Sequence, residues 1–322
     1  MSAISGIDQA LWDIKGKYHQ VPVYDLLGGP VRNKIEVYSW IGGDEPKIIV
    51  EEVQKVVDKG FKTIKINGTG RLRPIDSFQE VDALLERMAV LRENFGSKIN
   101  IGIDFHGRVS LPMAKILIKK LEEFNPIFIE EPLLSENIEG LKTISRMSSI
   151  PIALGERLFS RWDFKAIFQQ NIADIIQPDL SHAGGITECV KIASMAEAYD
   201  VAVAPHCPLG PIALSACLQL DAVAYNAAIQ EQSLGIHYNQ RNDLLDYAIN
   251  SHIFQNRDGF MDIPSGPGLG IEVNEDYVIE MSKTKLLTGW QEDIEVRKIR
   301  EWEEVAELND LLSSNYNNVV GK

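Results

Sequence analysis

The sequence predicts a closed α/β barrel, and three observations support this fold class. From Ile35 onward, short apolar segments rich in β-branched residues alternate with longer amphipathic segments, as in βα units around a parallel sheet. Six of the expected strands end in a carboxylate or an imidazole at intervals of 23 to 27 residues, about the length of one βα unit. The 322 residues can hold a barrel of roughly 200 to 250 residues and a smaller element.

The elements of the barrel are expected in strict alternation. Strands are expected at residues 35–40, 63–67, 99–104, 127–130, 152–156, 174–179, 201–206 and 227–231. Helices are expected between them, for example at residues 47–59, 74–94, 111–124, 185–199 and 212–225. Eight strands with helical crossovers indicate a closed barrel.

A helix is expected before the barrel. Residues 5–17 have an amphipathic pattern with Ile7, Leu11 and Ile14 on one stripe, and the break at Gly28-Gly29-Pro30 ends this region. We expect this helix to pack on the barrel. The N-terminal region, residues 1–34, is therefore predicted to be a helix and linker packed on the barrel of residues 35–250.

The C-terminal region, residues 251–322, is predicted to be a surface segment followed by a helical tail. Its first part is rich in turn residues, including the run Gly266-Pro267-Gly268-Leu269-Gly270. Residues 294–312 form a charged, helix-like stretch that suits packing or oligomer contacts better than a site.

The composition excludes several classes of function. A net charge of −14 without a basic stripe argues against a nucleic-acid partner, because phosphate binding needs clustered lysine and arginine. No apolar run approaches the roughly 20 residues that span a bilayer, and the first residues lack the pattern of a signal peptide. We therefore expect no membrane partner and a cytoplasmic location. Cys189, Cys207 and Cys217 form no CxxC pair, which indicates reduced thiols.

The strand ends carry the chemistry. The residues concerned are Asp104, Glu130, Glu156, Asp179, His206 and Glu231. Residues one βα unit apart occupy equivalent places on neighbouring strands, so all six should line the C-terminal rim, where barrel active sites lie. Three converging carboxylates, Asp104, Glu130 and Glu156, would repel one another without a cation between them, and an all-oxygen set favours Mg²⁺.

Histidines near this cluster are candidates for proton transfer. If the strand ending at Asp104 continues to His106, the two side chains point to the same side, so His106 should overhang the metal. Asp179 and His206 end consecutive strands, so the carboxylate could bond one imidazole nitrogen and leave the other basic. No Gly-x-Ser-x-Gly motif accompanies them, which disfavours a serine nucleophile.

Six segments of the rim resemble the mandelate racemase subgroup of the enolase superfamily. They are Asp104-Phe105-His106-Gly107-Arg108, Phe128-Ile129-Glu130-Glu131-Pro132, Leu154-Gly155-Glu156-Arg157, Gln177-Pro178-Asp179, Ala204-Pro205-His206 and Gln230-Glu231-Gln232. The resemblance runs from about Ser2 to Trp290 and implies a TIM-type (β/α)7β barrel with a remnant of an N-terminal capping region and a C-terminal extension. It also implies a homo-oligomer.

By this resemblance, the chain is a Mg²⁺-dependent dehydratase of a sugar acid, with D-galactonate preferred. Asp104, Glu130 and Glu156 are implied as the ligands of Mg²⁺. His206, oriented by Asp179, is implied as the base that removes the C2 proton. His106 is implied as the acid that protonates the departing 3-hydroxyl, and Glu231 as a hydrogen-bonding partner of the substrate carboxylate.

The sequence departs from the family pattern at two places. Racemases of the subgroup carry Lys-x-Lys at the end of the second strand, whereas this chain has Lys65-Ile66-Asn67. Asn67 cannot act as a base, which favours dehydration over two-base racemisation. Lys65 could place positive charge near the substrate carboxylate or extend outward from the rim, with Asn67 as a further substrate contact.

The second departure is at the N-terminus, because the chain begins near the end of the capping domain that family members carry. Such a lid would exclude water and select the substrate. Two alternatives therefore stay open: a dehydratase of another aldonic acid, and a lidless barrel that serves as a non-catalytic subunit or binding protein.

Overall fold

The computed structural model describes residues 1–42, 45–70, 72–234 and 244–283 of the chain. The chain divides into two compact units, Met1–Glu272 and Val273–Lys322. In the second unit the described part ends with helix α10 (Glu275–Lys283), and the expected helical tail at residues 294–312 lies outside the described residues. Among the described residues, no helix is long and apolar enough to cross a membrane.

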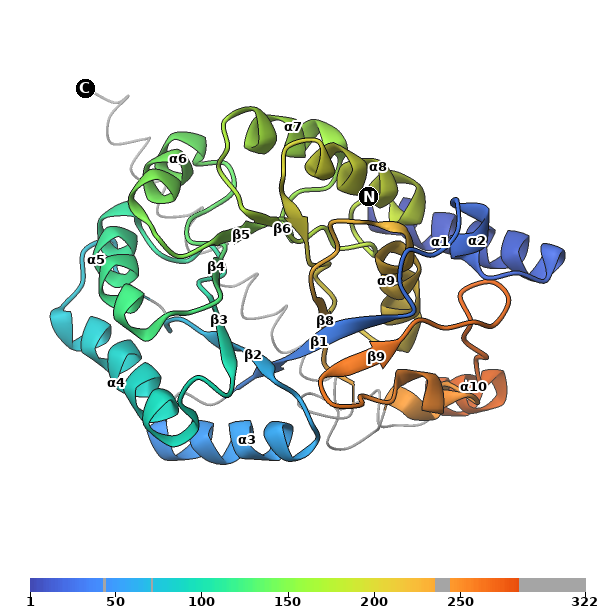
Figure 1. Cartoon of the computed structure of the whole chain (residues 1–322), viewed down its shortest axis with the longest axis horizontal. Helices are drawn as coiled ribbons and strands as arrows, with labels where there is room; N and C mark the ends of the chain where they lie inside the picture. Colours follow the sequence, from blue (N-terminus) through green and yellow to red (C-terminus); the bar gives the residue numbers. More distant parts are fainter. Residues whose placement is uncertain (43–44, 71, 235–243, 284–322) are drawn as a thin grey trace, which may run out of the picture. The chain divides into compact units, whose positions relative to one another are not determined.

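The first unit is the predicted α/β barrel (Figure 1). Its parallel strands are β1 (Lys34–Ile41), β2 (Thr63–Asn67), β3 (Asn100–Asp104), β4 (Phe128–Glu130), β5 (Ile152–Leu154), β6 (Ile175–Ile176), β7 (Ala202–Val203) and β8 (Gln230–Gln232). They pair in the order β7-β6-β5-β4-β3-β2-β1-β8. A parallel bridge between Val203 and Ala227 joins the two ends, so the sheet closes on itself.

One helix follows each of the first seven strands. These helices are α3 (Pro46–Asp58), α4 (Phe78–Phe95), α5 (Leu111–Leu121), α6 (Ile138–Met147), α7 (Arg161–Gln169), α8 (Gly185–Glu197) and α9 (Pro211–Val223). Figure 1 shows them around the outside of the sheet. The (β/α)7β arrangement is therefore confirmed.

The strand sequences explain how the sheet fills both of its faces. In β2, Ile64 and Ile66 are buried in the large apolar cluster that includes the helices, while Lys65 between them points into the barrel. A separate interior cluster includes Tyr38 and Phe128. Gly102 of β3 makes room for this cluster, because a Cβ at that position would lie 2.5 Å from the Phe128 ring. The barrel interior thus contains an apolar cluster, and polar side chains such as Lys65 lie toward the C-terminal ends of the strands.

Several strands end earlier than the sequence predicts. β5, β6 and β7 end at Leu154, Ile176 and Val203, so the functional residues expected at their ends lie in the loops just beyond. The backbone leaves the ladder there because local contacts replace it; for example, Asp179 accepts a hydrogen bond from the Ser181 backbone N–H at 2.7 Å.

The N-terminal helix α1 (Ser2–His19) packs on the barrel through small and polar residues rather than through its apolar stripe. Gln9 donates to the Leu180 carbonyl at 2.9 Å and Trp12 donates to Thr187 Oγ1 at 2.8 Å. The apolar stripe named in the sequence, Ile7, Leu11 and Ile14, is 60 to 62% exposed. The contacting face of α1 instead uses residues such as Gln9, which reach backbone groups of the barrel.

The segment after the barrel contributes to the fold as well as to the surface. Strand β9 (Phe260–Asp262) pairs antiparallel with the first residues of β1. Met261, Leu269 and Ile271 are buried, and the bridge between Pro22 and Gly268 ties this segment to the chain near helix α2 (Val23–Leu26). The expectation of a purely surface segment therefore fails for these residues.

Candidate active site

The six polar residues predicted for the C-terminal rim gather there. Asp104 and Glu130 are the last residues of β3 and β4 and are register partners. Glu231 lies within β8. The loops after β5, β6 and β7 carry Glu156, Asp179 and His206. Consecutive βα units thus bring together residues spread over more than 120 positions, as the fold requires.

Lys65 lies at the centre of the carboxylates. Its Nζ is 2.8 and 2.9 Å from the two carboxylate oxygens of Glu130, 2.8 Å from Glu231 Oε1 and 3.9 Å from Asp104 Oδ2. The side chain is fully buried, so the alternative that it extends outward from the rim is wrong. Strand alternation explains this, because both neighbours of Lys65 face the helices.

One ammonium cannot neutralise three buried carboxyl groups. Burial raises the pKa of Glu130 to about 8 and that of Asp104 to about 7, even though the Lys65 cation opposes both shifts. Burial also acts against ionisation of Glu231, but the charges of Lys65 and His206 outweigh it and lower the pKa of this carboxyl. The cluster therefore has acid groups in excess of its cations, and an added cation would be favoured there.

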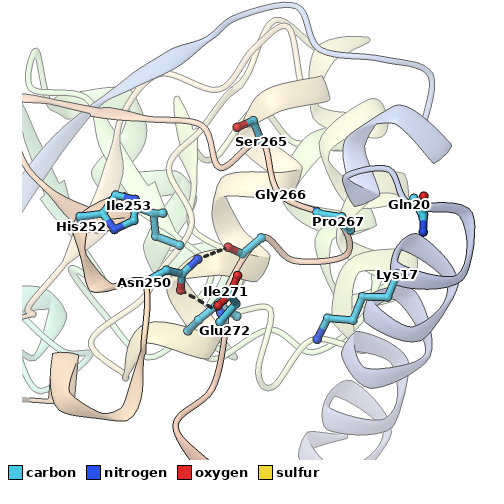
Figure 2. Close-up of a pocket in the computed structure, with 11 residues that line it drawn as sticks. Lys17, Gln20, Asn250, His252, Ile253, Ser265, Gly266, Pro267, Ile271 and Glu272 are labelled. Carbon is cyan, nitrogen blue, oxygen red and sulfur yellow. Dashed lines mark hydrogen bonds between the residues drawn. The ribbon is translucent and has the colours of Figure 1, made fainter.

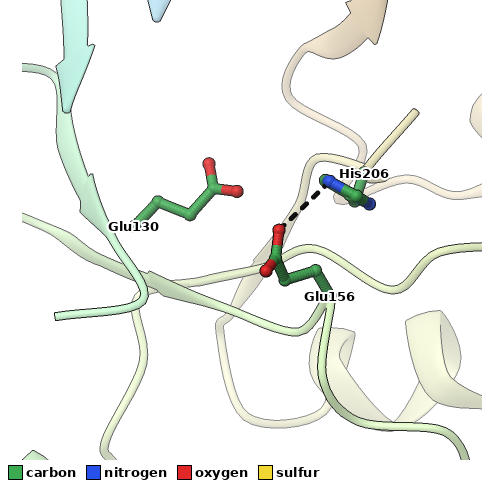
Figure 3. Close-up of side chains that lie close together, drawn as sticks. All are labelled: Glu130, Glu156 and His206. Carbon is green, nitrogen blue, oxygen red and sulfur yellow. Dashed lines mark ion pairs between the residues drawn. The ribbon is translucent and has the colours of Figure 1, made fainter. Parts of the chain in front are cut away.

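His206 forms the predicted pair with Asp179. Its Nδ1 lies 2.9 Å from Asp179 Oδ2, and its Nε2 lies 3.1 Å from Glu156 Oε2 (Figure 3 shows the second contact). Burial works against the imidazolium, but the charge of Glu231 and the bonds to Asp179 and Glu156 raise the pKa of His206 well above its ordinary value. The same imidazolium helps to lower the pKa of Glu156 to about 2, against the effect of burial.

His106 lies beyond the end of β3 with its backbone in the left-handed region, at φ 52°. The strand therefore does not continue to this residue, although the expected proximity to Asp104 holds: His106 Nε2 is 3.1 Å from Asp104 Oδ2. Burial, followed by the charge of Arg108, lowers the pKa of His106 to about 4. The two rim histidines thus differ sharply in their tendency to carry a proton.

A group of side chains that could hold a metal ion lies at this rim. Glu130, Glu156 and His206 each offer a ligand atom within 4.8 Å of the others (Figure 3). The expected set contains Asp104 in place of His206. Asp104 belongs to the same cluster through Lys65, and its raised pKa shows that it shares the need for positive charge. Two of the three expected ligands therefore lie within the geometric group, and the carboxylate oxygens suit a hard divalent cation.

Sequence reasoning did not single out three residues that contact the site. Gln177 donates to Glu130 Oε2 at 2.8 Å, and Tyr38 lies beneath it inside the barrel. Arg157 contacts the loops after β3, β4 and β5. Gln177 could have been found, because it lies two residues before Asp179 and should share its face of a strand. Asn67 accepts a hydrogen bond from Trp40 Nε1 at 3.3 Å, which leaves its amide NH₂ for another acceptor.

A hollow of about 750 Å³ lies away from the rim, between the C-terminal end of α1 and the segment after the barrel (Figure 2). Asn250, at its centre, donates to the Gly270 carbonyl and accepts from the Glu272 backbone N–H, both at 2.8 Å. These polar groups satisfy one another within the chain. The titratable cluster at the rim, rather than this hollow, is the candidate active site.

Models of two protein domains match the chain. Residues 49–277 match the enolase C-terminal domain-like family, and residues 1–28 match the mandelate racemase / muconate lactonizing enzyme N-terminal domain. The first match covers more than half of the chain and includes all six rim residues. The second ends within the segment that follows α1.

Similar proteins agree with these matches. The chain is 59% identical to D-galactonate dehydratase of Pectobacterium atrosepticum over 283 residues, which are 88% of this chain and 74% of that protein. The structure of a mandelate racemase/muconate lactonizing enzyme-like protein from Rubrobacter xylanophilus superimposes with a TM-score of 0.80 at 29% identity, covering 87% and 76% of the two chains. The structure of the 3,6-anhydro-D-galactonate cycloisomerase of Zobellia galactanivorans superimposes with a TM-score of 0.76 at 32% identity, covering 87% of this chain and 75% of that one. The chain therefore belongs to the mandelate racemase and muconate lactonizing enzyme family of the enolase superfamily.

Proposed function

We propose that this protein is a Mg²⁺-dependent hydro-lyase that converts D-galactonate into 2-dehydro-3-deoxy-D-galactonate and water. The observation that carries the proposal is the His206–Asp179 pair beside a buried cluster in which Asp104, Glu130 and Glu231 surround the single ammonium of Lys65. The identity of 59% to a D-galactonate dehydratase supports this substrate among the sugar acids.

His206 is proposed as the base that removes the proton from C2. Asp179 bonds Nδ1 at 2.9 Å, which fixes the ring and leaves Nε2 directed at the cluster. The negative charge of Asp179 also stabilises the imidazolium that forms on proton transfer. Loss of this C2–H bond leaves negative charge on the substrate carboxylate, which requires positive charge nearby.

His106 is proposed as the acid that gives its proton to the 3-hydroxyl as the C3–O bond breaks, so that the hydroxyl leaves as water. β3 and β7 are four places apart in a ring of eight strands, so the loops that carry His106 and His206 lie across the barrel from each other. Base and acid can therefore act on opposite sides of the substrate. Ketonisation of the resulting enol completes the 2-keto product.

The metal ligands are proposed to be Asp104, Glu130 and Glu156. Bound Mg²⁺ would supply positive charge to the substrate carboxylate as C2 loses its proton. We further propose that Lys65 binds the same carboxylate and that Glu231, 2.8 Å from Lys65, takes up a proton when the anionic substrate binds and donates it in a hydrogen bond to that carboxylate. The free amide of Asn67 is proposed to contact a substrate oxygen.

Incubation of the chain with Mg²⁺ and a panel of aldonic acids tests the proposal, with 2-keto products trapped as semicarbazones. D-galactonate should give product faster than the other acids. Product from a different aldonic acid alone would show that this acid, rather than D-galactonate, is the substrate. Absence of product from every acid would refute the dehydratase assignment in favour of a non-catalytic barrel.

The metal assignment has its own test in thermal unfolding. Mg²⁺ should raise the melting temperature because it binds the folded chain, and Glu130→Gln should abolish the rise by removing a charged ligand. Glu139→Gln, an exposed substitution in the first turn of α6, is the matched control and should leave the rise intact. An unchanged rise in Glu130→Gln would exclude Glu130 as a ligand.

A further inference from the structure

Arg157 connects three loops of the rim. It follows Glu156 in the loop after β5, and its Nη2 donates to the backbone carbonyl of His106 at 2.8 Å. Its Nε lies 3.4 Å from Glu156 Oε1 and 3.8 Å from Glu131 Oε2. The planar guanidinium therefore spans the ends of β3, β4 and β5.

The loop that Arg157 contacts has an unfavourable backbone conformation. His106 is a non-glycine residue at φ 52°, and Gly107 follows it at φ 65°. Such a conformation is unfavourable for a residue with a Cβ and persists only where its surroundings fix it. The surroundings here are two further bonds: Asp104 Oδ1 accepts from the His106 N–H at 2.7 Å, and the Glu131 carbonyl accepts from the Gly107 N–H at 2.8 Å.

The guanidinium of Arg157 lies against the backbone at Gly107. A Cβ at this position would lie 3.4 Å from Arg157 Nε and 3.3 Å from Leu134 Cδ2. The φ of 65°, rather than the space, is what favours glycine at this position. Contacts of its backbone N–H and carbonyl with Asp104 and Arg157 fix His106 in this turn. Its imidazole has a contact with Asp104, which is itself a proposed metal ligand.

We propose that Arg157 is a positioning residue for His106: its bond to the His106 carbonyl keeps the proposed general acid aimed at the 3-hydroxyl of the substrate. This inference rests on the proposed dehydration. The positions of acid groups matter because a misplacement of about 1 Å can slow a reaction about 100-fold. Asp179 and His206 lie in the loops after β6 and β7 and are not among the groups that Arg157 contacts in the described structure.

The inference predicts that the two halves of the reaction respond differently to substitution of Arg157. Arg157→Gln removes the charge and the fork of donors, while Arg157→Lys keeps the charge but cannot span the three loops. Arg161→Gln is the matched control, because Arg161 lies four residues further on and pairs with Glu188 at 2.8 Å. Each variant is assayed in D₂O with Mg²⁺ and D-galactonate, for exchange of the C2 proton by NMR and for semicarbazone product.

Arg157→Gln should lower product formation about 100-fold and change exchange less than about threefold, so that the ratio of exchange to product rises. The ratio of exchange to product in Arg157→Lys should lie between the ratios of Arg157→Gln and the native chain. Arg161→Gln should leave this ratio unchanged. Equal loss of exchange and product, or no loss, would overturn the proposal.

A second measurement separates His106 from Glu156, which Arg157 also approaches. Mg²⁺ should raise the melting temperature of Arg157→Gln as it does that of the native chain, because the proposed ligands stay in place. Loss of this rise would show that Arg157 acts through Glu156 and would refute the assignment to His106. Failure of the native chain to make product would count against the proposed function rather than against Arg157.

Discussion

The two histidine-bearing sides of the rim are built differently. On the β7 side, carboxylates contact both ring nitrogens of His206, and they raise its pKa well above the ordinary value against the effect of burial. On the β3 side, His106 is fixed through its backbone, and burial with the charge of Arg108 lowers its pKa to about 4. The surroundings therefore favour the protonated form of His206 and the neutral form of His106.

Bound cation and substrate would each reduce this contrast. A cation at Glu130 and Glu156 would reduce the negative charge around His206 and lower its pKa, freeing Nε2 from Glu156. An anionic substrate beside His106 would raise the pKa of that imidazole.

The largest expected effect comes from removing each imidazole. His206→Asn should lower both C2 exchange and product formation about 1,000-fold, because the base is needed for the first step. His106→Asn should lower product formation about 100-fold and preserve exchange. NMR in D₂O with the semicarbazide assay measures both quantities, and the exposed His252→Asn is the control. Exchange at the native rate in His206→Asn would reverse the assignments.

A smaller effect is expected from pH on the affinity for Mg²⁺. In the metal-free chain the raised pKa values of Glu130, about 8, and Asp104, about 7, mean that protons occupy these carboxyls at pH 6 and must leave when metal binds. The raised pKa of His206 acts in the same direction. Affinity should therefore increase as pH rises from 6 to 8, by up to about tenfold per pH unit for each proton displaced.

Calorimetric titration at pH 6, 7 and 8 in buffers of different ionisation enthalpy measures this affinity and the protons released together. Glu130→Gln tests the source of the effect, since removing that carboxyl should remove both binding and release. An affinity for Mg²⁺ that is constant or falls with rising pH would contradict the view that protons occupy the buried carboxyl groups before the metal binds.

The rim residues could be predicted because their positions follow from chain topology. Asp104, Glu130 and Glu231 lie about one βα unit or its multiples apart, and a closed parallel barrel places such residues on one edge whatever the details of the loops. The pairing of Asp179 with His206 followed from the same rule. Consecutive strand ends leave few other partners within reach.

Features that depend on loop conformation or on a choice of neighbour could not be predicted in this way. The periodicity of α1 correctly marks an apolar stripe with Leu11 on it, but Gln9 and Trp12 on the other face find backbone and hydroxyl partners on the barrel. The contacts of Arg157 depend on the left-handed turn at His106, which no local pattern requires. Periodicity predicts what a face is made of, and the tertiary structure decides what it contacts.

The smallest expected effect tests the backbone support of His106 directly. Gly107→Ala places a Cβ 3.4 Å from Arg157 Nε at a φ of 65°, so it should destabilise the chain by about 1 kcal/mol and shift the His106 loop. Product formation should fall about fivefold while C2 exchange stays within twofold, because His206 is fixed by side chains of other strands. Gly6→Ala is the matched control, since nothing lies within 4 Å of its Cβ in α1 and alanine favours helix. If Gly107→Ala lowers exchange and product equally, the two sides of the rim are not supported independently, and the contrast between the histidines loses its structural basis.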